Sequence, residues 1–331
     1  MAEDMSLDKQ LLAACKAGNS GAVASLLDQG ADPGCSQAGG ETCLMVAAGE
    51  GHGDCVALLL SAGAPWHDLD DEGYSAGDYA SGAGHAEAFR QLLDWAVRAE
   101  LILGAAARRA APADRPGPSE QGYLAEGVRY SEGRLVDDQG EAVMMDWEAP
   151  LMREHARIIC ERAGPSARVL NRGPARHVII EAHPAVLEHM EREGWKSRPG
   201  VQVVAGRWQD VIDDLGPFDG IFFDTYGEYA EDMREFHQHL PRLLAPGGVY
   251  SFFNGLCPDN MFFNLVQCEV VKLELARLGI QTSYSPMKMD ASADKIWEGI
   301  KNRYWHLPVY MVPTCVKVET DEQEDDGEEP Q

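Results

Sequence analysis

A 33-residue repeat constrains the fold of the first third of the chain. Gly18, Gly51 and Gly84 mark its period. A pair of leucines follows each glycine at a matching offset: Leu26-Leu27, Leu59-Leu60 and Leu92-Leu93. A repeat of this length is one supersecondary unit, and it buries its apolar face only against its neighbours. The period therefore predicts a stack of three helical units, which is about the minimum that is stable alone.

The middle unit shows the expected helices most clearly. Residues 41–48 and 54–60 are predicted to form its two helices, and Gly30 and Gly63 stand where helix-terminating glycines occur. The pattern resembles ankyrin repeats, so we expect an all-α ankyrin-like domain over residues 1–104, with an unrelated helical bundle as the alternative. Such a module either binds a protein partner or supports its neighbouring domain, and the sequence leaves both roles open.

A change in composition follows the repeats. Residues 105–122 are rich in Ala, Arg and Pro and lose all periodicity, which indicates a linker. Apolar runs then alternate with helical patterns, which predicts a mostly parallel sheet in an α/β domain over residues 123–318. Strands are expected at 167–171, 177–181, 201–205, 220–224 and 248–254, and helices at 184–193 and 229–244. Residues 319–331 are expected to be a disordered acidic tail.

The charge of the chain restricts its partners. The net charge is −26, and −18 remains when the acidic tail is left out. A strongly acidic surface repels nucleic-acid phosphate and anionic membranes and attracts basic proteins. We therefore expect a basic protein substrate and no direct binding of nucleic acid or membrane. No run of the sequence is long and apolar enough to span a bilayer.

The eight cysteines show no C-x-x-C pair and no Cys/His ligand spacing. This distribution predicts neither a disulfide framework nor a metal site. Reduced thiols are expected, in a soluble monomer of the cytoplasm and nucleus.

Two acidic side chains follow predicted strands. Glu181 ends the apolar run 177–181, and Asp224 ends the run 220–224. In open α/β sheets, ligands bind beyond the carboxyl ends of the strands, and an acid there can hold the hydroxyl pair of a ribose. Asp224 is the sharper of the two signals, because many strands end in Glu.

Residues 123–317 resemble the arginine N-methyltransferase 2 branch of the guanidinoacetate methyltransferase family. The stretches that carry the resemblance are 146–152 (DWEAPLM), 177–183 (HVIIEAH), 206–210 (GRWQD), 220–228 (GIFFDTYGE) and 243–256 (LLAPGGVYSFFNGL). Trp297-Glu298-Gly299 and Tyr304-Trp305 are also typical of the branch. The resemblance implies the class I, Rossmann-like fold of enzymes that use S-adenosylmethionine as the methyl donor.

The resemblance also implies the roles of the catalytic residues. Glu148 and Asp224 are expected to hold the substrate guanidinium, because a planar guanidinium pairs well with two carboxylates. They are also expected to accept the proton that leaves as nitrogen attacks the methyl group. Glu228 could join them, although a capping or solvent-facing role is the more usual one at its position.

The donor-binding residues are carried over in the same way. Glu181 is expected to bind the ribose, with Ala182 and His183 lining the same loop, and Asp224 to border the donor. The remaining expected contacts are Trp208 and Gln209 at the adenine, Met152 near the sulfonium, and Tyr123 or Tyr130 as an entrance aromatic. Two alternatives stay open: His183 as a loop residue bonded to backbone, and Trp208 as a core aromatic.

The chain departs from the family between its first two expected strands. Only residues 172–176 separate Asn171 from His177, whereas a crossover between parallel strands needs a dozen residues or more. The family's glycine-rich donor loop and the helix behind it do not fit there, so we expect one of the two strands to be frayed or displaced. A splice form or incomplete gene model, a loss of activity, and a rebuilt pocket are the three explanations, in that order.

The predicted function is methylation of an internal guanidino nitrogen of arginine in a ribosomal protein. One alternative is an enzyme of the same fold that methylates free guanidinoacetate, although a metabolite needs no docking module. The other is a non-catalytic ankyrin scaffold, which the missing donor loop favours.

Overall fold

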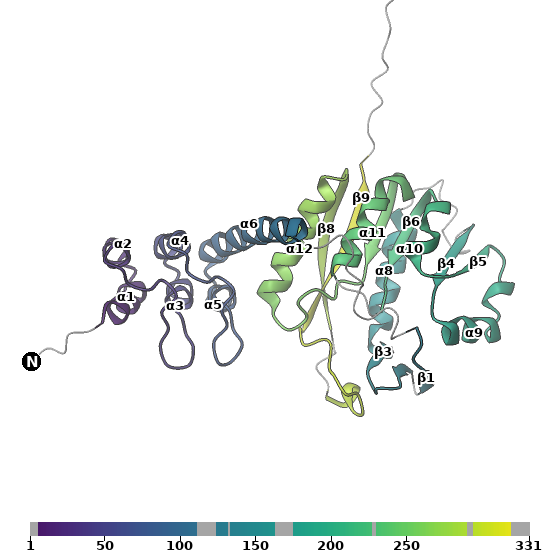
Figure 1. Ribbon diagram of the computed structural model, residues 1–331, viewed down its shortest axis with the longest axis horizontal. Coiled ribbons are helices and arrows are strands. Elements are labelled where there is room, and N and C mark those ends of the chain that lie inside the picture. Colours follow the sequence, from purple (N-terminus) through teal and green to yellow (C-terminus); the bar gives the residue numbers. More distant parts are fainter. Residues whose placement is uncertain are drawn as a thin grey trace, which may run out of the picture. The chain divides into compact units, whose positions relative to one another are not determined.

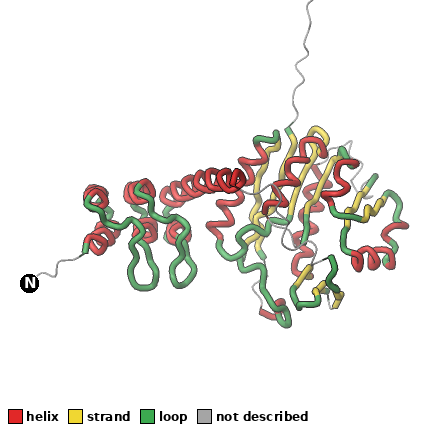
Figure 2. The backbone as a smooth tube through the Cα atoms, in the orientation of Figure 1, coloured by secondary structure: helices red, strands yellow, loops and turns green. Residues whose placement is uncertain are grey.

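The computed structural model describes residues 6–110, 124–131, 133–162, 175–226, 230–289 and 294–318. The chain forms two compact units that are not consecutive in sequence. Unit 1 combines Met1–Arg115 with Leu256–Val271, and unit 2 combines Pro116–Gly255 with Lys272–Gln331. Figures 1 and 2 show the helices and strands of each. The expected acidic tail, from Glu319 on, lies outside the described residues.

Unit 1 contains three helix pairs, as the 33-residue period predicts (Figure 1). The pairs are α1 (Leu7–Lys16) with α2 (Ser20–Asp28), α3 (Cys43–Gly49) with α4 (Gly53–Ser61), and α5 (Ala76–Gly82) with α6 (Ala86–Ala110). Gly18, Gly51 and Gly84 lie in the turns within the pairs, with φ of 66°, 75° and 78°. Only glycine adopts this left-handed conformation at no steric cost, which explains why it marks the period.

The last helix of the repeats is longer than expected. α6 continues to Ala110 and thus takes in the first residues of the predicted linker. Ala and Arg are strong helix formers, so the loss of periodicity after residue 104 does not end the helix. Residues 111–122, the rest of the predicted linker, lie outside the described residues.

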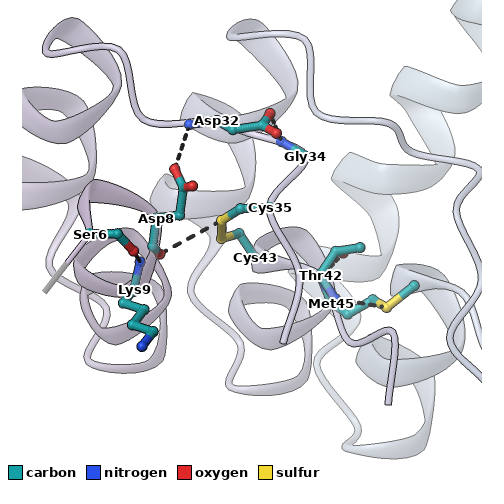
Figure 3. Close-up of a disulfide and its surroundings, with 9 residues drawn as sticks. All are labelled: Ser6, Asp8, Lys9, Asp32, Gly34, Cys35, Thr42, Cys43 and Met45. Carbon is teal, nitrogen blue, oxygen red and sulfur yellow. Dashed lines mark hydrogen bonds between the residues drawn. A yellow bond between two sulfur atoms is a disulfide. The ribbon is translucent and has the colours of Figure 1, made fainter. Parts of the chain in front are cut away.

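A disulfide joins Cys35 and Cys43, so the expectation of reduced thiols is wrong for this pair (Figure 3). The connection between α2 and α3 folds back on itself, with a bridge between Ser36 and Thr42. The amide of Cys43 donates to the carbonyl of Cys35 over 3.0 Å. This turn brings the two Cα atoms to 6.0 Å, a separation that suits a disulfide. No cysteine motif in the sequence predicts this pairing.

Unit 2 has a small antiparallel sheet and two sheets that contain parallel pairs (Figure 2). The antiparallel sheet is β1 (Val128–Ser131), β2 (Arg134–Asp137) and β3 (Ala142–Met145). β4 (His177–Glu181) pairs in parallel with β5 (Val201–Ala205). The largest sheet has the order β6 (Phe218–Phe223), β7 (Leu244–Phe252), β9 (Val309–Lys317) and β8 (Ile280–Lys288).

The observed strands agree with the predicted ones where both can be compared. β4 and β5 have the predicted bounds, while β6 and β7 begin earlier than predicted. β6 and β7 are parallel, whereas β9 runs antiparallel to both of its neighbours. β4 pairs with β5 along its whole length, so β4 is not frayed. The expected strand 167–171 lies outside the described residues, and its displacement stays a prediction.

Helices join and cover the strands of unit 2. They are α8 (Ala149–Arg162), α9 (Pro184–Arg192), α10 (Trp208–Val211) and α11 (Ala230–Leu243), with 3-10 turns at Asp146–Glu148, Trp195–Ser197, Ile212–Asp214 and Asp294–Trp297. His237 of α11 contacts Tyr250 of β7, and His155 of α8 contacts Ser251. Because successive strand residues point to opposite faces, α8 and α11 cover opposite faces of the sheet.

The remaining helix, α12 (Met261–Ala276), belongs to both units, since unit 1 ends at Val271 and unit 2 resumes at Lys272. No helix in the described part of the chain combines the length and apolar character needed to cross a membrane.

Candidate functional site

Asp224 follows the last residue of β6 directly, at the carboxyl end of a strand with a parallel neighbour. Solvent reaches the side chain, and the surrounding protein still raises the pKa of its carboxyl to about 6 by desolvation. A carboxyl that protein surrounds on most sides and that water can still reach is available to a ligand.

Glu148 lies at the start of α8, in the turn that connects β3 to this helix. Its side chain is 9% exposed. One carboxyl oxygen, Oε2, accepts the amide of Met145 over 3.1 Å. The pKa of Glu148 is raised to about 7: burial raises it most, the charge of Asp224 also raises it, and the hydrogen bonds from Tyr304 and Met145 lower it in part. The charge of Asp224 thus reaches the carboxyl of Glu148 and opposes its ionisation.

Tyr304 is the second partner of Glu148. Its hydroxyl donates to Oε1 of the carboxylate. Burial and the charges of Glu148 and Asp224 raise the pKa of Tyr304, so this hydroxyl stays protonated and acts as a donor. The sequence marks Tyr304 only as a feature of the family branch, and its bond to an acid 156 residues away was not predicted.

Aromatic rings surround this bond. Tyr304 lies 5.7 Å from Trp147 and 5.0 Å from Trp297, measured between ring centroids. Trp305 lies 6.5 Å from Trp147 and is fully buried. These rings exclude water from one side of Glu148 and strengthen its electrostatic interactions.

A buried polar network holds α8 against the sheet. Nδ1 of His155 lies 2.7 Å from the Ser251 hydroxyl, and Nε2 lies 3.2 Å from the Tyr310 hydroxyl. Burial lowers the pKa of His155 to about 4, so the ring is neutral. Tyr310 also accepts the amide of Asn254 over 2.6 Å. The network therefore fixes both the helix that begins beside Glu148 and the loop after β7. Met152 lies in the first turn of α8, four residues after Glu148, and is half-buried.

Glu181 ends β4, as predicted, and burial raises the pKa of its carboxyl. Its Oε1 accepts the amide of His183 over 2.6 Å, across Ala182. The His183 ring is buried: Nδ1 accepts the amide of Ala185, which caps α9, and Nε2 lies 3.2 Å from the Glu126 carbonyl. Both ring nitrogens of His183 thus contact backbone groups, which agrees with the alternative that His183 is a loop residue bonded to backbone.

Tyr130 lies in β1, near Glu181. Burial raises the pKa of the Tyr130 hydroxyl, and the charge of Glu181 raises it further. Its ring is 40% exposed and stacks on His189 of α9 at 4.0 Å. Tyr123, the other candidate for the entrance aromatic, lies outside the described residues, as does Glu228.

Trp208 begins α10 and is 6% exposed. Its ring packs edge-on against Phe236 at 5.3 Å and Phe223 at 6.1 Å. This packing corresponds to the core alternative for Trp208. Gln209 follows it on the same helix and is half-buried.

Comparison with known proteins identifies the family of the chain. The model of the guanidinoacetate N-methyltransferase family matches residues 129–318, more than half of the chain. This chain belongs to the guanidinoacetate N-methyltransferase family. Three copies of the ankyrin repeat match residues 11–101. The predicted combination of ankyrin repeats with an α/β methyltransferase domain is confirmed.

Several relatives of this family member carry the name protein arginine N-methyltransferase 2. The one from Yarrowia lipolytica is 38% identical over 224 residues, which cover 60% of this chain and 47% of that protein. The chain thus spans about half the length of this relative. The one from Aspergillus oryzae is 31% identical, covering 78% of this chain and 77% of that protein. The one from Cryptococcus neoformans is 29% identical, covering 83% of this chain and 85% of that protein.

The sequence predicts that residues 172–176 are too few to form the glycine-rich donor loop of the family. Of these, only Ala175 and Arg176 lie within the described residues. The residues described at the end of β4 fit a ribose, because a half-buried carboxylate there can accept bonds from two hydroxyls.

Proposed function

We propose that this chain is a protein arginine N-methyltransferase that takes its methyl group from S-adenosylmethionine. The proximity of Glu148 and Asp224, contributed by the β3–α8 turn and the end of β6, is the observation that carries the proposal. The names of the relatives support the same reaction class.

The acid pair suits a guanidinium. Two carboxylates on different elements can each pair with the planar fork, which fixes the plane of the group and the direction of the attacking nitrogen. A site without carboxylates would bind a guanidinium weakly. Here the bound cation favours the ionised form of both carboxyl groups. Binding of the substrate therefore lowers the pKa of each carboxyl and relieves the repulsion between them.

Glu148 is the better placed of the two to take a proton. Its pKa of about 7 is near the value that favours general-base work at neutral pH. Tyr304 holds Oε1 in place, and the amide of Met145 holds Oε2. A carboxylate fixed at both oxygens orients the guanidinium without rearranging as nitrogen loses its proton.

The methyl donor would be held by Glu181 at its ribose, with Tyr130 beside that acid and Met152 on the helix that begins at Glu148. When bound, S-adenosylmethionine supplies a methyl group activated by a sulfonium. The protein's part is to align that methyl group with the nitrogen held by Glu148 and Asp224.

The substrate we propose is a basic protein, such as a ribosomal protein, because the acidic chain steers cationic partners toward it. An arginine in a basic segment satisfies both this field and the acid pair. A non-catalytic scaffold is the second candidate, since only five residues separate Asn171 from His177.

A labelled methyl donor tests the proposal. The purified chain is mixed with the donor and either a basic ribosomal fraction or guanidinoacetate. Label in protein supports the proposal, label only in guanidinoacetate indicates the small-molecule reaction, and no label in either overturns catalysis by this chain. Calorimetry of donor binding accompanies the assay: micromolar affinity for the donor supports the enzyme, and the absence of both donor binding and transfer identifies the scaffold.

A further inference from the structure

Unit 1 contains more than the ankyrin repeats, because residues 256–271 belong to it. Phe262, Val266 and Val270 of α12 are buried in the same apolar core as the helices of the repeats. These three residues recur every four positions, so they form one stripe on the helix. One apolar stripe of α12 thus packs in the core of the repeats.

Aromatic contacts fix where this stripe packs. Phe262 is 1% exposed and meets Phe89 of α6 edge-on at 5.7 Å. It also fills the space above Gly77 of α5, where a Cβ would lie 2.1 Å from the Phe262 ring. Phe263 meets Trp66 at 5.8 Å. The close approach at Gly77 requires a residue without a side chain, so this surface of α5 is shaped for an aromatic ring.

One carboxylate oxygen ties the two segments together. Oδ2 of Asp78 accepts the amide and hydroxyl of Ser75, which caps α5. The same oxygen accepts Nδ2 of Asn260 over 2.7 Å. Asn260 in turn caps α12, since its Oδ1 accepts the amide of Phe263 over 3.0 Å. The starts of α5 and α12 therefore share a single acceptor.

The segment before α12 is held as well. Nδ2 of Asn264, which is fully buried, donates to the Leu256 carbonyl over 2.6 Å. Leu256 follows Gly255 in the loop after β7. At the start of that loop the amide of Phe253 donates to the carbonyl of Phe223, the residue before Asp224. The loop that begins beside the candidate site thus ends in a segment bound by the repeats.

We propose that the ankyrin repeats bind the chain's own segment Leu256–Val271 and thereby fix the loop after β7, with Asp78 and Asn260 as positioning residues. In this role the repeats are part of the transferase and do not act only as a docking module for other proteins. The proposal concerns the anchoring of the loop and does not depend on which group is methylated.

Hydrogen exchange of the full chain tests the proposal. Asn260→Asp keeps a good helix cap but turns the bond to Asp78 into a repulsion between two carboxylates. We expect amides of residues 253–271 to exchange roughly five- to tenfold faster. Asp78→Asn combined with Asn260→Asp restores a donor opposite the carboxylate, and we expect it to recover most of the protection.

The matched control is Asn19→Ala, which removes the cap of α2 in the first repeat. We expect it to speed exchange in α2 and leave residues 253–271 unchanged. Gln267→Glu, which places a second acid near Glu100 of α6, is an independent variant expected to act like Asn260→Asp. Unchanged exchange at residues 253–259 in both variants overturns the proposal, as does an equal effect of Asn19→Ala there.

Discussion

The acids at the ends of β4 and β6 belong to two differently constructed halves of the candidate site. Glu181 is held by the amide of His183, two residues along the chain. The proposed partner of Asp224 is Glu148, which is held by Tyr304 from the far end of the domain. The hydrogen bond that holds Glu181 is thus local, whereas the proposed guanidinium side needs three distant segments to be in place. Changes on the guanidinium side should affect the chemical step, and changes on the donor side should affect binding of the donor.

The largest effect is expected from Asp224→Asn. It removes one of the two charges proposed to hold the guanidinium, so methyl transfer to an arginine peptide should fall by more than about 100-fold. Donor affinity measured by calorimetry should change little. Asp219→Asn, the same change at an exposed position of β6, is the control and should keep full activity. Turnover by Asp224→Asn at the normal rate contradicts the assigned role.

Glu181→Gln tests the donor side. Loss of a charged acceptor for the ribose should weaken donor binding by about tenfold or more, while transfer at saturating donor changes much less. Glu188→Gln on the exposed side of α9 provides the matched control. If Glu181→Gln lowers the rate at saturating donor and leaves affinity intact, the division between the two halves is wrong.

Tyr304→Phe should have a smaller effect and a characteristic pH dependence. The Tyr304 hydroxyl lowers the pKa of Glu148, so its removal raises that pKa and leaves less carboxylate at neutral pH. We expect the rate at pH 7 to fall by several-fold to about tenfold, with the acidic limb of the pH–rate profile moved to higher pH. The exposed Tyr74→Phe is the control. A uniform loss at every pH would indicate a packing defect and no effect on Glu148.

The smallest expected effect is on stability. Because folding raises the pKa of Glu148 from 4.5 to about 7, the native state binds more protons than the unfolded state between these values. Stability should therefore decrease as pH rises from about 4.5 to 7 and stay reduced above. Glu148→Gln should remove part of this decrease. Between pH 5 and pH 8 the variant should lose on the order of 1–2 kcal/mol less of its free energy of unfolding than the parent chain does. Urea unfolding at the two pH values measures it, and an unchanged slope excludes a buried, proton-binding Glu148.

The parts of the fold that could be predicted depend on short-range patterns. The glycine period gave the helix pairs because each turn needs a left-handed residue, and alternating apolar runs gave β4 and β5. The Cys35–Cys43 disulfide, the full length of α6 and the antiparallel β9 were not predicted. The first depends on the shape of a turn, the second on helix propensity beyond the apolar stripe, and the third on pairing between distant strands.

The acids of the proposed site could be named from the sequence, but the contacts that support them could not. Family resemblance indicated Glu148 and Asp224, and the charge of Asp224 contributes to the raised pKa of Glu148. Nothing in the local sequence indicates that Tyr304 bonds Glu148 or that His155 ties α8 to β7. The same holds for α12, since Asn260 and Asp78 meet across 182 residues of chain. Such contacts depend on how whole helices and strands pack, so no periodic pattern in the sequence predicts them.

The division of α12 between the two units has a consequence for biosynthesis. The repeats leave the ribosome first, but the stripe that covers their last apolar surface follows roughly 150 residues later, about 10 to 30 s at ordinary rates of synthesis. During that interval Gly77 and Phe89 face no partner ring. Newly made repeats of this protein should therefore be a substrate for chaperones until translation has passed Val271.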